Sequence, residues 1–286
     1  MLKIDASSES TLQLKGIVMN FPASVENATK THSYPLVFAT VCGAHLTGLD
    51  SPTSPYEIRG AHILPVRQVL GLEINEETLE LSQEAEGVQI EVATQDIKKF
   101  FSLMLKDNGF VLEQIYSPLV VQSSPEHEEL KAIAKGCLTR IHCYHYLGFA
   151  DSQWLAASQE TSGAQELMSL NKLLSVYRLL LTGTHLMQTG EIETNLAKLN
   201  ENFLLKYIDD MIERNLSTEK SQSLEADEWE FHKVEYERLR DVLEDSADST
   251  NLPAAATAHS ALDDLLKRIR LADADLLTQF QPAGNY

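Results

Sequence analysis

The residues best suited to chemistry are a glycine–alanine pair and two glutamates that lie in apolar segments. Gly43-Ala44 follows the run PLVFATVC, while Glu57 lies in PYEIRGAHIL and Glu91 lies in GVQIEVAT. Backbone amides at a tight glycine turn that opens a helix hold phosphate oxygens. Carboxylates that converge from adjacent strands hold divalent ions, which clamp the attacking and leaving oxygens of a transferred phosphoryl group. Nucleotidyl transfer requires a strand, a glycine–small pair, a short helix, a turn and then carboxylates two residues apart on the next strand, where this chain has Pro55 and Glu57.

The loop between the first two apolar segments carries a family likeness. It reads VCGAHLTGLDSPTSPYEIRG from Val41 to Gly60 and resembles the DNA polymerase beta superfamily of nucleotidyltransferases. Its closer similarity is to the RNA-repair-associated RlaP/YcgL-like group, whose loop runs Gly-Ser-x-x-x-Gly-Leu and then Ser-Asp-x-Asp-x-Arg-Gly. Similarity in DIKKFFSLMLKDNGFVLEQIYSP and LNKLLSVYRLLLTGTHLMQTGEI extends the likeness over roughly residues 34–216. The loop positions that match are Gly43, Gly48, Leu49, Ser54, Arg59 and Gly60.

This resemblance implies a function and a set of site residues. The chain would bind a nucleoside triphosphate and transfer a nucleotidyl group to a hydroxyl acceptor, such as an RNA end or a protein. Glu57 and Glu91 would be catalytic and would hold magnesium or manganese. The implied contacts to the nucleotide are Gly43, Ala44, Ser54, Arg59, Lys172 and Arg178.

The chain departs from the family pattern at the metal-binding positions. Pro55 stands where the first aspartate belongs and has no side-chain oxygen, and Glu57 replaces the second aspartate. Ala44 replaces a serine whose hydroxyl would bond a phosphate oxygen. Two hypotheses therefore remain open: a nucleotidyltransferase with an altered metal site, or a catalytically inactive binding or regulatory module with a degenerate active site. In the second case Glu57, Glu91 and Arg59 are ordinary surface charges.

Periodicity predicts the elements that position these residues. Apolar runs predict strands in SYPLVFATVCG and IRGAHILPV, and the alternation in GVQIEVAT predicts a third strand with one polar face. Helical spacing follows in TQDIKKFFSLMLKDNG, with Thr94 as the expected cap and Asn108-Gly109 as the expected end. The expected fold class is α+β: a nucleotidyltransferase-type mixed sheet in residues 1–124, then a helical domain in 125–286 with an acidic terminal region.

Composition limits the partners. The 286 residues carry a net charge of −19, so nucleic acid binding requires a local basic patch. The opening MLKIDASSES has neither the basic start nor the apolar core of a secretory leader, and no apolar run reaches the length of a membrane span. With three cysteines in addition, a cytoplasmic location is expected.

A cluster of cysteines and histidines in CLTRIHCYHYLGF suggests a second, weaker site. Cys137 and His142 are five residues apart and do not share a helix face, whereas His142 and His145 do. Two ligands are too few for a structural zinc ion. The favoured interpretation is an aromatic-rich helix that packs against the first domain.

Overall fold

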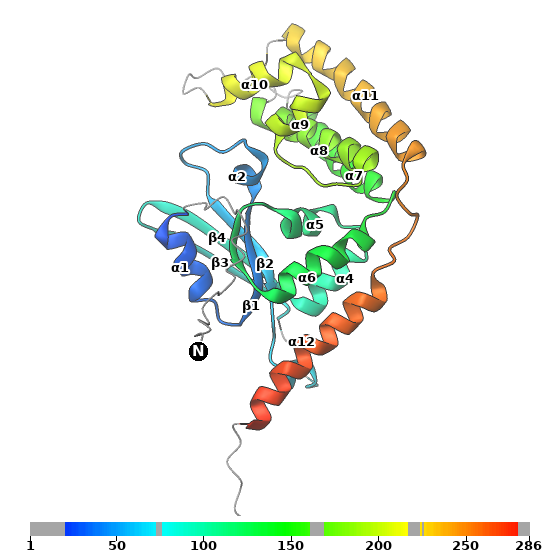
Figure 1. Ribbon diagram of the computed structural model, residues 1–286. Helices are drawn as coiled ribbons and strands as arrows, with labels where there is room; N and C mark the ends of the chain where they lie inside the picture. Colours follow the sequence, from blue (N-terminus) through cyan, green and yellow to red (C-terminus); the bar gives the residue numbers. More distant parts are fainter. Residues whose placement is uncertain (1–20, 73–75, 161–168, 217–223, 225, 280–286) are drawn as a thin grey trace, which may run out of the picture.

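The computed structural model describes residues 21–72, 76–160, 169–216, 224 and 226–279 (Figure 1). A mixed five-stranded sheet forms the first part, with the order β3-β4-β2-β1-β5, and helices form the rest. Only β2 and β4 run parallel; the other neighbours are antiparallel. The α+β prediction is confirmed. The strands are β1 (Leu36–Cys42), β2 (Tyr56–His62), β3 (Thr78–Ala85), β4 (Val88–Asp96) and β5 (Val120–Ser123).

The two faces of the sheet are covered differently. Helix α1 (Ala23–Lys30) packs Val25 and Ala28 against buried side chains of β1, β2 and β4. The opposite face meets α4 (Ile97–Met104), α5 (Gly109–Tyr116) and α6 (Pro125–Ala134), whose apolar side chains join one continuous core with the helical part. Since side chains alternate between faces along a strand, this second face is the one that carries Glu57 and Glu91.

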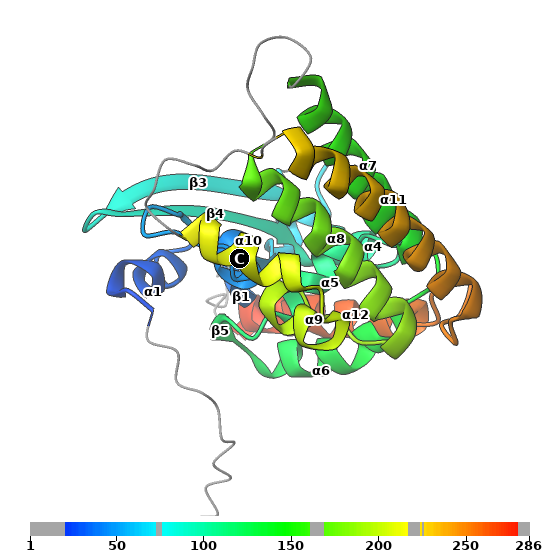
Figure 2. The ribbon, with the colours of Figure 1, turned by 90° about the horizontal axis from the view of Figure 1, so that it is seen from above.

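Helix α8 is the centre of the helical part (Figure 2). It contacts α7, α9, α10 and α11, and Leu170, Tyr177 and Leu181 are among its fully buried residues. Stacking of Trp154 on Trp229 and Tyr236 ties α7 to α11. No described helix combines the length and apolar character that a membrane span requires. The bounds are α7 (His142–Glu160), α8 (Leu170–Thr189), α9 (Leu196–Phe203), α10 (Lys206–Leu216) and α11 (Ala226–Ser249).

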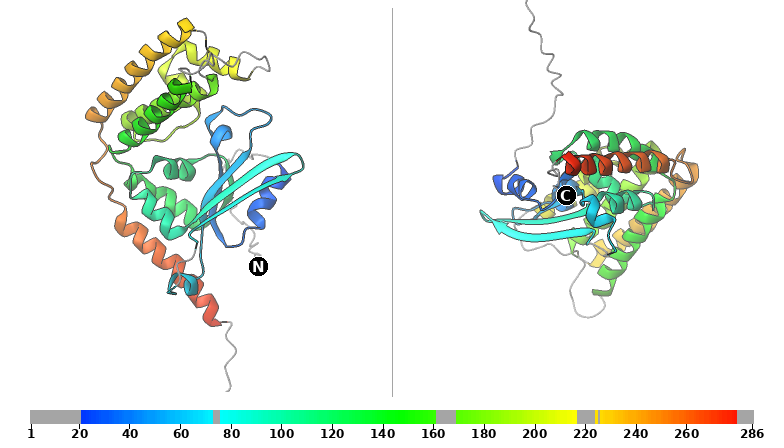
Figure 3. Two further views of the ribbon diagram at one scale, coloured as in Figure 1. Left: turned by 180° about the vertical axis from the view of Figure 1, so that it is seen from behind. Right: turned by 90° about the horizontal axis from the view of Figure 1, so that it is seen from below.

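The last helix, α12 (His259–Gln279), returns to the first part of the chain (Figures 1 and 3). It contacts α3 (Val66–Val69), α4 and α6. Arg270 donates to both carboxylate oxygens of Asp96 and to the carbonyl of Leu64. The domain boundary near residue 124 stays a prediction, and α12, although it belongs to the second half of the sequence, packs against the part that contains the sheet.

Several expected boundaries are wrong in detail. Thr94 does not cap α4, because β4 continues to Asp96, whose Oδ1 accepts the Lys98 amide at 3.0 Å. Asn108 does not end that helix but caps α5 by accepting the Phe110 amide. Leu204, with a φ of 54°, separates α9 from α10. The opening MLKIDASSES lies outside the described residues.

Candidate functional site

The turn at Gly43 joins β1 directly to the short helix α2 (Gly43–Thr47). Gly43 has a φ of 61°, a conformation that favours glycine. A β-carbon at this position would lie 2.0 Å from Oε1 of Glu57. Glycine is therefore required twice over, for the backbone conformation and for the carboxylate that packs against it.

Glu57 lies between two neighbours on the sheet. In the antiparallel pair it is opposite Cys42, and in the parallel pair it is opposite Glu91. Directly opposed residues of adjacent strands project on the same face. The expectation that the two glutamates lie side by side at the glycine turn is confirmed, while their catalytic and metal-binding roles stay predictions.

Arg59 is the cation of this cluster. Its Nη2 donates to Glu57 Oε2 at 2.8 Å, and its Nη1 donates to the carbonyls of Ile58 and Glu91, each at 3.3 Å. The guanidinium thus spans β2 and β4 and neutralises Glu57. By contrast, the Glu91 carboxylate forms no hydrogen bond or ion pair with the rest of the described chain. One glutamate is partnered, and the other keeps its acceptors available.

The donor set limits which metal arrangement fits. Among the described residues, no group of three or more His, Cys, Asp or Glu side chains is placed to hold a metal ion. Glu57 and Glu91 supply two carboxylates, and Pro55 supplies none. Magnesium is commonly held by one or two carboxylates together with substrate phosphates. The residues therefore fit one divalent ion shared with a triphosphate, and do not fit the two-metal arrangement.

A buried charged layer lies beneath the turn. Burial raises the pKa of the Cys42 thiol to about 12, and the negative charges of Glu113 and Glu57 add to the increase. Glu113, on α5, accepts a hydrogen bond from Arg178 Nη1 at 2.9 Å, and both side chains are almost entirely buried. Burial, reinforced by Glu113, raises the pKa of Tyr146 well above its ordinary value. This layer links α5 and α8 to the end of β1.

The remaining site residues have varied surroundings. Arg178 is already paired with Glu113, so its contact with a nucleotide stays a prediction. Ser54 closes a turn in which its hydroxyl accepts the Ser51 amide at 2.9 Å. The Ala44 carbonyl accepts the Leu49 amide, and Lys172 is exposed at the start of α8. The structure thus groups Gly43, Glu57, Arg59 and Glu91, while Ser54 and Arg178 have hydrogen bonds of their own.

Sequence reasoning missed two residues near the turn. The first is Asn195: a β-carbon on Gly48, which ends α2 with a φ of 74°, would lie 2.6 Å from its Nδ2. Asn195 also caps α9, so the helical part touches the loop directly. Glu113 was the other omission. Its position in the apolar helix FVLEQIY was a usable signal, because a carboxylate on a buried helix needs a partner.

The cysteine–histidine cluster is part of the packing. The three cysteines are free and buried, and burial raises the pKa of Cys137 and of Cys143 to about 11. His142 is fully buried and its Nδ1 lies 3.1 Å from the Thr139 hydroxyl, which donates to Asp107 at 2.6 Å. Burial lowers the pKa of His142. This network closes the loop before α7.

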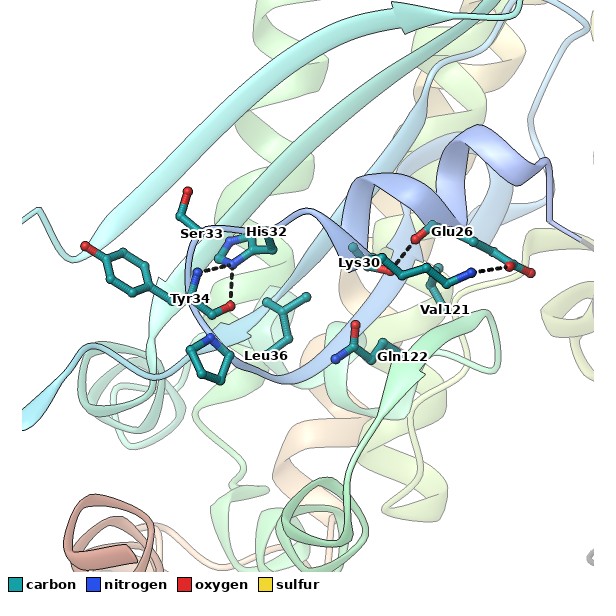
Figure 4. Close-up of a pocket in the computed structure, with 10 residues that line it drawn as sticks. Glu26, Lys30, His32, Ser33, Tyr34, Leu36, Val121 and Gln122 are labelled. Carbon is teal, nitrogen blue, oxygen red and sulfur yellow. Dashed lines mark hydrogen bonds and ion pairs between the residues drawn. The ribbon is translucent and has the colours of Figure 1, made fainter. Parts of the chain in front are cut away.

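A separate hollow of about 770 Å³ lies at the opposite end of β1 (Figure 4). It is bordered by α1, by residues 32–36 and by β5. Lys30 pairs with Glu26 at 3.1 Å on its rim, and His32 hydrogen-bonds to the backbone of Tyr34. Since Leu36 begins β1 and Cys42 ends it, the hollow is distinct from the Gly43 turn.

Comparison with known proteins supports the likeness read from the loop. The profile of RlaP, described as the RNA repair pathway DNA polymerase beta family, matches residues 20–268. The uncharacterized protein MJ0002 of Methanocaldococcus jannaschii is 26% identical over 166 residues, which are 56% of this chain and 64% of that relative. The chain thus covers slightly less than two thirds of the relative. The family match includes every residue of the candidate site.

Proposed function

Because the chain belongs to the RNA repair pathway DNA polymerase beta family, and is therefore nucleotidyltransferase-like, we propose that it binds a nucleoside triphosphate beside the Gly43 turn and transfers a nucleotidyl group to a hydroxyl, such as that of an RNA end. The observation that carries the proposal is the position of Glu57, packed against Gly43 and in register with Glu91. Two carboxylates are brought to a glycine turn from adjacent strands, as the chemistry requires.

Each residue of the cluster has a role in the proposal. Glu57 and Glu91 hold a single magnesium or manganese ion, which supplies charge neutralisation to the bound phosphates. The amides of Gly43 and Ala44 bind phosphate oxygens. Because Gly43 has no side chain, the phosphates can approach the backbone closely. Arg59 adds a fixed positive charge at the boundary of the two strands. Lys172 and Arg178 add positive charge from α8.

A second candidate function is a nucleotide-binding or regulatory module without catalysis. The contact that favours it is the ion pair between Arg59 and Glu57, since a guanidinium at 2.8 Å occupies an oxygen that a metal would need. Pro55 removes a further ligand. In this alternative the cluster binds phosphates through Arg59, and the acceptor hydroxyl is not activated.

Nucleotide binding and transfer distinguish the two functions. Transfer is measured by incubating each labelled triphosphate with magnesium or manganese and an RNA oligonucleotide that has a free terminal hydroxyl. Binding of the triphosphate is measured separately by calorimetry. Glu57→Gln is compared with Glu80→Gln, which changes an exposed glutamate on β3 of the same sheet. Transfer that Glu57→Gln abolishes and Glu80→Gln preserves supports the enzyme. Binding without transfer supports the module, and absence of nucleotide binding contradicts both.

A further inference from the structure

Two segments of this acidic chain contain no acid. Residues 97–106 and 130–150 carry six lysines and arginines and none of the 42 aspartates and glutamates. They are Lys98, Lys99, Lys106, Lys131, Lys135 and Arg140. We call these two segments together the basic strip. On a protein with a net charge of −19, such a strip is a local exception to the general repulsion of nucleic acid.

The cations in α4 and in the turn after it are exposed. Lys98 and Ser102 lie on one exposed side of α4 and Lys106 follows in the turn, while the other side of the helix is buried. The Thr139 hydroxyl donates to Asp107 at 2.6 Å, which brings the end of α4 beside the loop that carries Arg140. The two segments therefore form one continuous surface.

Three cations of the basic strip have no carboxylate partner among the described residues, whereas Lys131 pairs with Glu128 at 2.9 Å. Lys98, Lys106 and Arg140 form no ion pair with any part of the chain that the structure describes. The acids that border α4 are occupied, since Asp96 binds Arg270 and Asp107 accepts the Thr139 hydroxyl. Within the described part of the chain most other lysines and arginines are paired, for example Arg178 with Glu113 and Arg238 with Glu235.

Exposed aromatic side chains follow directly after the last cation. Tyr144 lies one turn after Arg140 and is 70% exposed. Phe149 is 42% exposed and packs against Phe110 with ring centroids 4.6 Å apart. A surface that combines unpaired cations with adjacent exposed rings has the features that proteins use to bind the backbone and the bases of a single strand.

The strip borders the candidate site through α5. A β-carbon on Gly109, at the start of α5, would lie 2.8 Å from His145 and 2.9 Å from the Tyr146 hydroxyl. Glu113, one turn along α5, belongs to the buried layer beneath Cys42. A strand bound along the strip thus lies against the same helices that support the Gly43 turn.

We propose that the basic strip binds single-stranded RNA, with Lys98, Lys106 and Arg140 contacting phosphates and Tyr144 stacking on a base. The choice of RNA rests on the proposed function, in which an RNA end is the acceptor. The surface itself is argued from charge complementarity and exposed aromatic area. Because phosphate contacts release counterions, the binding depends strongly on salt.

The test uses a fluorescein-labelled single-stranded oligouridylate and the full chain, with binding followed by anisotropy. Lys106→Glu/Arg140→Glu is compared with Lys206→Glu/Lys233→Glu, which reverses two other exposed and unpaired cations that lie among acids on α10 and α11. Both double variants change the net charge equally. The strip variant is expected to bind about tenfold or more weakly, while the control changes little. The slope of log K against log salt concentration should become shallower by about 1.4, because two phosphate contacts are lost.

Tyr144→Ala tests the stacking contact, with Leu155→Ala as the control because it removes a similarly exposed side chain from the same helix. Tyr144→Ala is expected to weaken binding about tenfold, as the loss of one stacked base does. Circular dichroism verifies that each variant is folded. Equal losses in the strip variant and in its charge-matched control, or no binding by the parent protein at about 50 mM salt, overturn the proposal.

Nucleotide binding is measured separately on the same variants. A strip variant that loses RNA and retains the triphosphate locates the RNA surface outside the Gly43 cluster, as the proposal requires. A parent protein that binds the oligouridylate at the strip but binds no triphosphate contradicts the proposed function and leaves the RNA surface standing.

Discussion

The two ends of the parallel pair β2–β4 use the same chemical groups for different purposes. At one end Glu57 is opposite Glu91 and binds Arg59; at the other His62 is opposite Asp96, which binds Arg270. The Asp96 side chain is 2% exposed, and both of its oxygens accept hydrogen bonds from backbone amides and from the guanidinium. The Glu57 side chain is 30% exposed.

The two ends differ in whether carboxylate oxygens remain without a hydrogen bond and so can bind a ligand. Every interaction of Asp96 is internal, so the pair anchors α12 to the sheet. At the Glu57 end, the Glu91 carboxylate has no hydrogen bond or ion pair in the described chain, and Gly43 leaves room for the Glu57 carboxylate because it has no side chain. An ion pair with no remaining acceptors stabilises the fold, whereas a cluster with acceptors to spare can bind a ligand. Substitutions at the two ends should therefore separate stability from binding.

The largest expected effect is on stability, from Arg270→Ala. Removing one partner of a buried ion pair leaves the other charge uncompensated, so the free energy of unfolding should fall by about 3 kcal/mol or more. Arg268→Ala, also on α12, removes exposed ion pairs with Glu129 of α6 and with Asp264, and should cost much less. Urea denaturation measures both. Equal losses would show that the Asp96 end is not an anchor.

Acid should weaken the same end of the sheet. His62 is fully buried, and burial lowers its pKa to about 4 from an ordinary value of 6.5. The unfolded chain then binds more protons between these two values, so this contribution to stability is present at neutral pH and is lost as the pH falls from 6.5 toward 4. At pH 5 the loss should be about 2 kcal/mol.

A non-titrating variant isolates this contribution. His62→Gln keeps a polar group near the Thr94 hydroxyl but cannot take up the proton. Its free energy of unfolding should therefore fall less than that of the parent between pH 7 and pH 5, as followed by urea denaturation. A pH dependence identical to that of the parent would rule out His62 as the source.

Gly43→Ala should have a smaller effect on stability and a specific effect on the candidate site. An alanine at a φ of 61° costs about 1–2 kcal/mol, and its β-carbon would displace the Glu57 carboxylate. Gly87→Ala is the matched control, because Gly87 has a φ of 75° and nothing within 4 Å of the added carbon. Both variants should lose similar stability, but only Gly43→Ala should lose triphosphate binding in calorimetry. Retained binding in Gly43→Ala would contradict the placement of the site.

Sequence patterns were sufficient for the strands that form the candidate site. The apolar runs and one alternating segment located β1, β2 and β4, and the resemblance aligned Glu57 with Glu91. Sequence patterns failed where the same residue type is compatible with two different positions in secondary structure. Asn108 can end a helix or begin one, and here it begins α5. Thr94 can cap a helix, but β4 continues past it to a stronger cap at Asp96.

Other features depend on contacts between distant residues. The chain turns at Leu204 between α9 and α10, where the Asn200 side chain hydrogen-bonds both the amide and the carbonyl of Leu205. The ion pair between Arg178 and Glu113 joins residues 65 positions apart, and no local sequence pattern predicts it. The same is true of Arg270 and Asp96, which are 174 positions apart. Tertiary packing decides these features, so spacing along the chain does not reveal them.

The most direct test of the central claim is the metal dependence of triphosphate binding in Glu91→Gln. The parent protein should bind a nucleoside triphosphate more tightly with magnesium or manganese than without, because Glu57 and Glu91 share the ion with the phosphates. Glu91→Gln should retain the parent's stability, since the Glu91 carboxylate forms no hydrogen bond or ion pair with the described residues, and should lose the metal-dependent part of the affinity. Metal-dependent binding that is unchanged in Glu91→Gln, or a parent protein that binds no triphosphate, would contradict the account.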